Sequence, residues 1–285
     1  MPVIAYIKQL RPKSWLKNVF VFMPLVFSLE LTNLPKLAMC GLAFVAFCLT
    51  SSTVYTFNDL LDAEQDAEHP IKCRRPIASG AIPKSGAAVF CALLLISGLT
   101  LALFVNLPTA VIAAAYLAIN VAYTIRLKHL AIIDCFCIAA GFVLRVYAGS
   151  AAIGDKVSNW LFLTVIAMSL FMAFGKRRGE MMKMEGSLTR HALEQYDLRF
   201  LNGMMFVCAG LMVVFYSLWA MARGLNMIYT VPVVIFIVCK YLLLVHDDDS
   251  HGDPTTVIFE DKTLLAASGL YALLTVGLLY AGRFM

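Results

Sequence analysis

Residues 36–66 read KLAMCGLAFVAFCLTSSTVYTFNDLLDAEQD, a mostly apolar run that gives way abruptly to a polar stretch at Asn58. As a helix, the run over residues 36–57 is long enough to cross a hydrocarbon core of about 30 Å. Similar runs recur along the 285 residues, which are 61% hydrophobic and 14% charged, with a mean hydropathy of +0.80. Soluble domains carry about 25% charged residues, so this composition predicts a polytopic membrane protein.

The apolar runs predict an all-α integral membrane protein with nine transmembrane helices. A chain in lipid must satisfy its own backbone hydrogen bonds, and these runs are too long and too uniform for barrel strands. The first run contains Lys17 and Pro24 and has no small-residue cleavage pattern after it, so we interpret it as a span and not as a signal peptide. The expected spans are 14–30, 36–57, 86–104, 108–125, 131–149, 158–175, 201–222, 229–246 and 264–282.

The distribution of Lys and Arg predicts the orientation. With the N-terminus inside, the cytoplasmic segments hold 17 of the 23 Lys and Arg residues and the opposite side holds 4, while Arg145 and Lys240 fall within spans. By the positive-inside rule this indicates a multi-pass protein of the plasma (inner) membrane with a cytoplasmic N-terminus. The net charge of +5 follows from this topology, and we expect no nucleic-acid partner.

The long polar loops suggest how the chain is organised. Residues 58–85 and 176–200 are the two longest cytoplasmic loops; they lie four spans apart and hold the densest charge in the chain. We therefore expect one transmembrane domain over 1–285, with two related halves, 14–125 and 131–246, and a ninth helix at 264–282. Ligands of membrane proteins often bind where such halves meet. The pattern of spans and loops is compatible with a homo-oligomer and does not predict one.

An acidic motif stands at the cytoplasmic end of the second span. Asn58, Asp59, Asp62 and Asp66 follow the pattern N-D-x-x-D-x-x-x-D. Spacings of three and four would keep the three aspartates on one helical face, where like charges repel unless cations lie between them. Oxygen ligands in this arrangement suit Mg²⁺, with Mn²⁺ as the alternative, bridging to substrate phosphates.

Basic residues follow the acids at once. Lys72, Arg74 and Arg75 lie within a short turn of the motif. Arg binds phosphate oxygens through paired donors, and Lys acts as a point charge. Acids for a metal ion beside bases for phosphate predict a diphosphate-binding site.

The stretch NDLLDAEQDAEHPIKCRRPIASG, residues 58–80, resembles the first aspartate-rich motif of the UbiA superfamily of intramembrane prenyltransferases, and the expected nine spans fit that superfamily. The resemblance implies a UbiA-type helical bundle with a cytoplasm-facing active site. It also implies a second aspartate motif after the sixth span. Here that position reads FGKRRGEMMKMEG, residues 174–186, with Lys176, Arg177 and Arg178 but no Asp.

One branch of the superfamily fits the absence of Asp from residues 174–186. The chain is similar to decaprenyl-phosphate phosphoribosyltransferases in LRPKSWLKNVFVFMPL (10–25), YTIRLKHLAIIDCFCIAAGFVLRVYAG (123–149), SLFMAFGKRRGEM (169–181) and KYLLLVHDD (240–248). That resemblance implies transfer of the 5-phosphoribosyl group of phosphoribosyl pyrophosphate (PRPP) to a polyprenyl phosphate such as decaprenyl phosphate, with release of pyrophosphate. The product would feed decaprenyl-phosphoryl arabinose and cell-envelope arabinan. Binding the 5-phosphate of PRPP requires additional cationic side chains, which the GKRR segment would supply.

The resemblance assigns roles to individual residues. Asp59, Asp62 and Asp66 would be the catalytic residues that hold Mg²⁺ on the pyrophosphate of the donor, with Asn58 hydrogen-bonded beside them. Other residues would bind substrate: Lys17 and Arg75 the diphosphate, Tyr123, Arg126 and Lys128 of YTIRLK a phosphate, and Lys176 and Arg177 the 5-phosphate. Glu180 would orient ribose hydroxyls or hold a second cation. Arg145, buried in the fifth span, would face the acceptor phosphate, because a charge at that depth needs an anionic partner.

Two alternatives stay open. A UbiA-type polyprenyltransferase acting on an aromatic acceptor such as 4-hydroxybenzoate shares the first motif, but the missing second Asp cluster argues against it. A membrane transporter would need ionisable residues at mid-depth in several spans, whereas only Arg145 and Lys240 qualify. We interpret His69 as a turn residue before Pro70, and HDDDSHGDP, residues 246–254, as a solvated loop and not as a metal site.

Overall fold

The computed structural model describes residues 2–182, 193, 195–224, 226–246 and 261–281. These ranges contain α-helices and 3-10 helices and no strand, which confirms the all-α prediction. Eight helical segments are long and apolar enough to cross a membrane: α3 (Leu34–Leu61), α5 (Lys84–Val105), α6 (Leu107–Ile125), α7 (Ile133–Ile153), α8 (Asn159–Met182), α10 (Leu198–Arg223), η4 with α11 (Met227–Thr230 and Val231–His246) and α13 (Lys262–Ala281). They correspond to the second through ninth expected spans.

The shorter elements connect these helices or precede them. They are α1 (Pro2–Gln9), η1 (Pro12–Phe22), α2 (Met23–Phe27), α4 (Ala63–Glu68), η2 (Lys72–Arg74) and η3 (Leu127–His129).

The first expected span, 14–30, is not among the eight. The structure forms the 3-10 helix η1 there, followed by the short α2. At about 2.0 Å per residue in a 3-10 helix and about 1.5 Å in an α-helix, the two together rise about 30 Å, the thickness of a hydrocarbon core. A ninth crossing therefore needs fewer residues here than an α-helix would use.

The 3-10 period of η1 has a clear physical cause in its contacts with α3. Three residues per turn put Trp15, Asn18 and Val21 on one face. The Trp15 indole donates to Ser52 Oγ at 3.1 Å, the Asn18 amide donates to Ser51 Oγ at 3.2 Å, and the Val21 carbonyl accepts from the Cys40 thiol at 3.3 Å. An α-helical period would rotate these side chains progressively away from α3.

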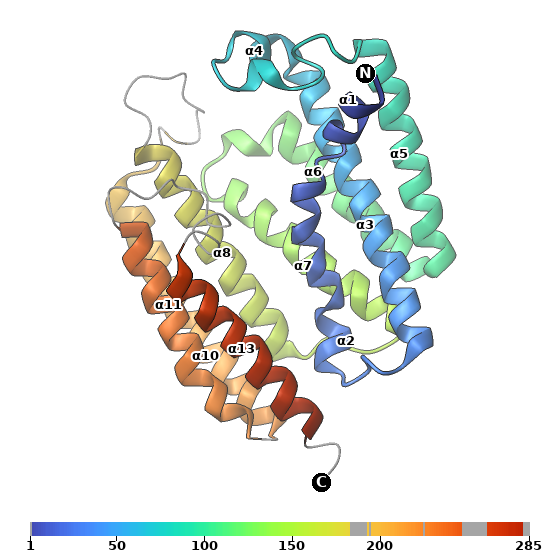
Figure 1. Cartoon of the computed structure of the whole chain (residues 1–285). Helices are drawn as coiled ribbons and strands as arrows, with labels where there is room; N and C mark the ends of the chain where they lie inside the picture. Colours follow the sequence, from blue (N-terminus) through green and yellow to red (C-terminus); the bar gives the residue numbers. More distant parts are fainter. Residues whose placement is uncertain (1, 183–192, 194, 225, 247–260, 282–285) are drawn as a thin grey trace. The chain divides into compact units, whose positions relative to one another are not determined.

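The described chain divides into two compact units. The first comprises residues 1–125 and 144–156, in which α3 packs along η1, α5 and α6 (Figure 1). The second comprises residues 126–143 and 157–285, in which α8 packs along α10 and α11 packs along α13. The relatedness of the expected halves, 14–125 and 131–246, stays a prediction.

Side-chain caps set the starts of several spans. An Asn or Asp oxygen accepts a backbone N–H three residues on, as N-cap residues do. The pairs are Asn33 with Lys36 (3.3 Å), Asn106 with Thr109 (2.8 Å), Asp197 with Phe200 (2.5 Å) and Asp261 with Leu264 (2.7 Å). The Leu264 N–H and the Lys240 ammonium, 3.2 Å away, lower the pKa of the Asp261 carboxyl below its ordinary value.

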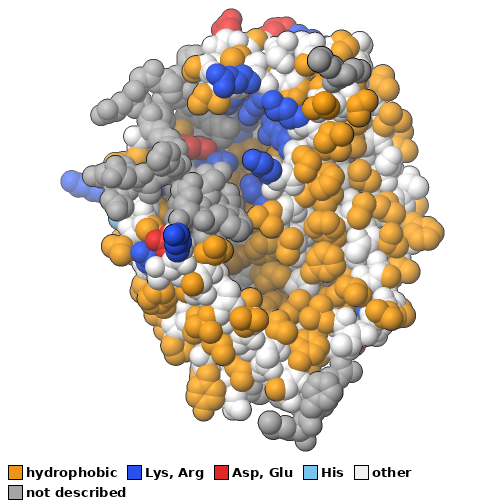
Figure 2. Space-filling model, viewed as in Figure 1, with side chains coloured by type: hydrophobic (Ala, Val, Ile, Leu, Met, Phe, Trp, Pro, Cys, Tyr) orange, Lys and Arg blue, Asp and Glu red, His pale blue; other side chains and the backbone are white. Residues whose placement is uncertain are grey.

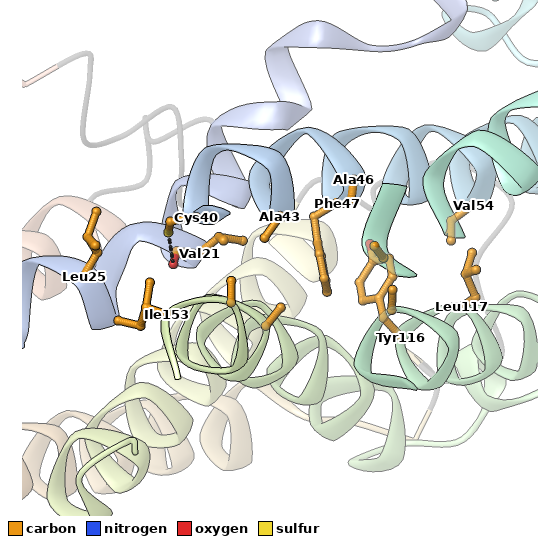
Figure 3. Close-up of a cluster of buried hydrophobic side chains, with 14 residues drawn as sticks. Val21, Leu25, Cys40, Ala43, Ala46, Phe47, Val54, Tyr116, Leu117 and Ile153 are labelled. Carbon is orange, nitrogen blue, oxygen red and sulfur yellow. Dashed lines mark hydrogen bonds between the residues drawn. The ribbon is translucent and has the colours of Figure 1, made fainter. Parts of the chain in front are cut away.

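Small side chains let the elements of the first unit approach closely. Ala43 and Ala46 of α3 are fully buried in a cluster with Val21 and Leu25, and Phe47 lies 5.5 Å from Tyr116 between ring centroids (Figure 3). Small residues at helix interfaces are typical of membrane bundles.

The outer surface is apolar, as lipid contact requires. The helix α5 exposes Val89, Leu93, Ile96, Leu103 and Phe104. Hydrophobic side chains cover most of the visible surface over α3 and α5, whereas acidic side chains gather toward the end near α4 (Figure 2).

Gly149 of α7 marks the closest approach in the first unit. A Cβ atom at this position would lie 1.8 Å from the Val21 carbonyl oxygen, which belongs to the backbone of η1. Only glycine fits such a contact, because the backbone of η1 cannot give way as a flexible side chain would.

We expect Gly149→Ala to lower the free energy of unfolding by about 3 kcal/mol, the upper end of the usual range for overpacking. The measurement is denaturant unfolding in detergent micelles. Gly41→Ala in α3 is the matched control, because a Cβ there meets nothing within 4 Å. Equal stability of the two variants would contradict the close approach.

Candidate functional site

Asp59, in the last turn of α3, is the most extensively bonded acid of the predicted motif. Its side chain is 2% exposed. Gln9 Nε2 donates to Oδ2 at 2.9 Å, and Arg11 Nη2 lies 2.6 and 2.7 Å from the two carboxylate oxygens. Arg75 Nη1 adds a third donor group at 3.0 Å. Burying a carboxylate this deeply is costly without partners, and the surrounding donors take the place of water.

Arg75 joins two of the predicted aspartates. The same Nη1 that contacts Asp59 lies 2.5 Å from Asp66 Oδ2, and Lys72 Nζ lies 3.8 Å from Asp66 Oδ1. The structure therefore brings two acids of the motif, Asp59 and Asp66, together with Arg75, and Asp66 also with Lys72.

Asp62 lies at the junction of two helices. The helix α3 ends at Leu61, Asp62 is its C-cap with φ −89° and ψ 5°, and α4 begins at Ala63. Asp62 accepts from Asn58 Nδ2 at 3.0 Å. The helix is divided at the middle aspartate, but the Asp62 N–H still donates to the Asn58 carbonyl at 3.0 Å and the Asp66 N–H to the Asp62 carbonyl at 2.8 Å. The shared face of the three aspartates therefore stays a prediction.

The donor chemistry of this region fits a hard cation. Asp59 and Asp66 are carboxylates held on one guanidinium nitrogen, so their oxygens already share a positive group. Asp62 and Asn58 add further oxygen atoms of the kind that Mg²⁺ prefers. In the described ranges no three acidic, His or Cys side chains form a preorganised metal-binding group. The Mg²⁺ site at the aspartate motif stays a prediction.

Arg11 introduces backbone strain beside the acids. It has φ 52° and ψ 59°, a left-handed conformation that is uncommon outside glycine, and it immediately precedes η1. Its guanidinium carbon lies 5.0 Å from the centroid of the Tyr55 ring. Residues held in such conformations cluster at functional sites.

Arg145 lies in a buried polar network of the first unit. It is 5% exposed, its Nε donates to Asn18 Oδ1 at 2.7 Å, and its Nη2 donates to Tyr116 OH at 3.0 Å. Asn18 in turn donates to Ser51 Oγ and to Cys48 Sγ. This network fastens η1 to the neighbouring helices, and the predicted contact of Arg145 with an acceptor phosphate stays a prediction.

In the second unit the GKRR bases at the end of α8 are mostly internal. Arg177 is 1% exposed; its Nε lies 2.5 Å from Asp134 Oδ2, and its Nη1 bonds Glu180. Arg178 is 8% exposed and donates to Asn202 Oδ1 at 2.8 Å and to the Val245 carbonyl at 2.5 Å. Lys176 is only half-buried. Of the two bases predicted to bind the 5-phosphate, Lys176 thus has the more accessible side chain.

The remaining predicted ligands lie on η1 and around the end of α6. Lys17 on η1, Tyr123 near the end of α6 and Lys128 in η3 are half-buried, and Arg126 is exposed. His69 Nδ1 accepts the backbone N–H groups of Ile71 (3.2 Å) and Lys72 (3.3 Å), which agrees with its interpretation as a turn residue. Residues 247–254 of the predicted solvated loop lie outside the described residues.

Sequence reasoning missed four residues that the structure ties to the predicted ones: Gln9, Arg11, Asp134 and Tyr196. Asp134 carried a usable signal, because an acid at the start of an apolar span is expensive unless it has a partner. The sequence contained no signal for Gln9 or Tyr196, because their roles depend on contacts with residues far away in the chain.

We expect Arg75→Gln to lower the free energy of unfolding by about 2 kcal/mol, less than for a fully buried ion pair because Arg75 is 27% exposed. The cause is the loss of the cation between two buried carboxylates. Adding Asp66→Asn should restore about half of that loss, since one of the unpaired charges is then removed. Thermal unfolding in micelles measures both.

The matched control is Lys84→Gln, which breaks the exposed pair with Glu64, 2.8 Å apart. We expect no measurable change, because exposed pairs contribute little. A double variant less stable than Arg75→Gln alone would contradict the bridging role of Arg75.

Comparison with known proteins adds to this geometry. Residues 19–260 match the model of the UbiA prenyltransferase family. The chain is 37% identical to a decaprenyl-phosphate phosphoribosyltransferase of Mycolicibacterium smegmatis over 78% of this chain and 71% of that protein. It is 36% identical to a decaprenyl-phosphate phosphoribosyltransferase of Corynebacterium glutamicum over 90% and 81% of the respective chains.

A solved structure supports the same fold. The structure of a UbiA homolog from Archaeoglobus fulgidus bound to GPP and Mg²⁺ superposes with a TM-score of 0.76, covering 97% of this chain and 98% of that one at 18% identity. At that identity the likeness concerns the fold alone. The family match spans most of the chain, and the close relatives cover most of its length: the chain belongs to the UbiA prenyltransferase family.

Proposed function

We propose that this protein transfers the 5-phosphoribosyl group of PRPP to a polyprenyl phosphate, such as decaprenyl phosphate, and releases pyrophosphate. Two findings agree in supporting the proposal. The relatives that are 36 and 37% identical over most of their lengths are decaprenyl-phosphate phosphoribosyltransferases. The chain also carries the basic GKRR segment in place of a second aspartate motif. In the pathway implied by this activity, the product is the precursor of decaprenyl-phosphoryl arabinose and of cell-envelope arabinan.

The aspartate motif is the proposed diphosphate end of the site. Asp59, Asp62 and Asp66 would hold Mg²⁺, or Mn²⁺ in its place, with Asn58 orienting Asp62 through their hydrogen bond. When bound, the divalent cation neutralises the diphosphate and stabilises the charge that develops on it as it leaves. Lys17 and Arg75 would bind the same diphosphate, and Arg11 lies beside Arg75 on the carboxylate of Asp59.

The bond that breaks joins C1 of the ribose to the diphosphate, and the bond that forms joins C1 to an oxygen of the acceptor phosphate. Positive charge develops on the ribosyl ring and negative charge on the leaving oxygens. Cationic side chains held in place by buried carboxylates need little reorganisation as this charge appears, which is the main source of electrostatic catalysis. The acceptor phosphate is already anionic near pH 7, so a strong general base is not required.

The other proposed ligands distinguish PRPP from prenyl diphosphates. Both classes of donor carry a diphosphate, whereas only PRPP carries a 5-phosphate and ribose hydroxyls. Lys176 would bind the 5-phosphate, and Glu180 the ribose or a second cation. Arg177, which the sequence also assigned to the 5-phosphate, is 1% exposed and bonded to Asp134 and Glu180. Tyr123, Arg126 and Lys128 would bind a phosphate, and Arg145 would face that of the acceptor.

The proposal includes a topology. Nine crossings, with η1 and α2 as the first, would put the N-terminus, the aspartate motif and the GKRR segment on the cytoplasmic face of the plasma membrane. This placement agrees with the excess of Lys and Arg in those segments. PRPP is a charged, water-soluble donor, so a cytoplasmic site would give it direct access.

We expect purified protein in micelles to form a phosphoribosylated lipid from labelled PRPP and polyprenyl phosphate. Prenyl diphosphate with 4-hydroxybenzoate, the substrates of the alternative, should give no product, because the GKRR segment replaces the second acidic cluster. Thin-layer separation of the labelled lipid measures both reactions. Product only from the second pair would overturn the proposal.

We expect EDTA to abolish activity and added Mg²⁺ to restore it. Asp62→Asn should lower kcat/KM for PRPP by about 100-fold or more, the loss that follows removal of a strong electrostatic group at a reacting centre. Glu64→Gln is the matched control, because Glu64 is an exposed acid two residues away whose partner is Lys84. Full activity of Asp62→Asn in the presence of EDTA would rule out the metal site.

A further inference from the structure

A chain of hydrogen bonds in the second unit ends at Glu180. The Ile132 backbone N–H donates to Tyr196 OH at 2.5 Å, and that hydroxyl donates to Asp134 Oδ1 at 2.7 Å. Arg177 Nε donates to Asp134 Oδ2 at 2.5 Å, and Arg177 Nη1 donates to Glu180 Oε2. We call Tyr196, Asp134, Arg177 and Glu180 the Asp134 relay.

Exposure separates Glu180 from the rest of the relay. Asp134 is 0% exposed, Arg177 1% and Tyr196 6%, whereas the Glu180 side chain is 29% exposed. A ligand can therefore reach Glu180 far more readily than the other three. The internal members serve to fix the position of the one accessible carboxylate.

Tyr196 is held in the protonated form that the relay needs. Burial, reinforced by the bond to Asp134, raises the pKa of its hydroxyl well above the ordinary value. The hydroxyl consequently stays a donor to Asp134. The Ile132 backbone that binds it has φ 69°, a conformation that a β-branched residue adopts only under constraint.

The relay favours a hydroxyl ligand over a second metal ion. Asp134 is 0% exposed between Arg177 and Tyr196, so the relay offers a cation the single carboxylate of Glu180, whereas the aspartate motif has three carboxylates. Mg²⁺ requires about six oxygen ligands, whereas a hydroxyl needs a single acceptor oxygen. One Glu180 oxygen is fixed by Arg177, which sets the direction of the other.

We propose that Tyr196 and Asp134 are positioning residues that act through Arg177 to aim Glu180 at the vicinal hydroxyls of the pentosyl donor. The inference rests on the proposed function for the identity of that donor. It gives Arg177 an internal role, in place of the direct contact with the 5-phosphate predicted from the sequence.

The test compares kcat/KM for PRPP with that for its 2-deoxy and 3-deoxy analogues. Glu180→Gln should reduce the discrimination against at least one analogue by about 10-fold, the effect of losing one charged hydrogen bond. Tyr196→Phe should reduce the same discrimination by about 3- to 10-fold. In the double variant, Tyr196→Phe should add less than about 2-fold to the effect of Glu180→Gln, because both changes act on one contact.

The matched control is Cys135→Ala, which removes a thiol 3.6 Å from the Tyr196 hydroxyl and leaves the four side chains of the relay itself unchanged. It should leave the discrimination unchanged. If Tyr196→Phe does not fold, Arg177→Lys tests the same link, since an ammonium cannot reproduce the Nε and Nη1 contacts together. Arg177→Lys is then expected to reduce hydroxyl discrimination and to leave discrimination between PRPP and ribose 1-diphosphate intact.

Two results would overturn the inference. In the first, Tyr196→Phe loses activity equally on all donors, and its effect multiplies with that of Glu180→Gln in the double variant. A general structural role of Tyr196 would produce this result. The other is loss of discrimination for the 5-phosphate alone in Arg177→Lys. An inactive wild-type protein would instead refute the proposed function, so the two failures are distinguishable.

Discussion

The carboxylate of Asp59 imposes the main constraint on the first unit. It lies 2% exposed at the end of a membrane-spanning helix, where an ion without partners would be very costly. Three segments far apart in the chain provide its partners: α1 through Gln9, the residue before η1 through Arg11, and the turn after α4 through Arg75. The course of the chain around this end of α3 follows from that requirement.

The same physical requirement operates separately in the second unit. Asp134 is fully buried and bonded to Arg177 and Tyr196, while Arg178 is bonded to Asn202 and the Val245 carbonyl. Buried ion pairs of this kind are poor sources of net stability, because desolvation offsets much of the attraction. Their value lies in fixing the directions of side chains, and in each unit the fixed groups include residues proposed to bind the donor.

The bases at the end of α8 stand where the resemblance to the UbiA superfamily implies a second acidic cluster. A second acidic cluster would bind another cation on the diphosphate, whereas Lys176 and the Asp134 relay offer one accessible base and one directed carboxylate. Such a pair suits a donor with a phosphate and hydroxyls on a small ring.

The sequence by itself determined the membrane class, eight of the nine expected spans and the pairing of acids with the bases that follow them. These features depend on hydropathy and on residues close together in the chain, so a local pattern was sufficient. The 3-10 form of η1 was not predictable, because it depends on contacts of Trp15, Asn18 and Val21 with α3. The break at Asp62 and the partners of Arg145 and Arg177 were likewise decided by tertiary structure. A buried charge must find its partner in three dimensions, and neither Gln9 nor Tyr196 is near its acid in the sequence.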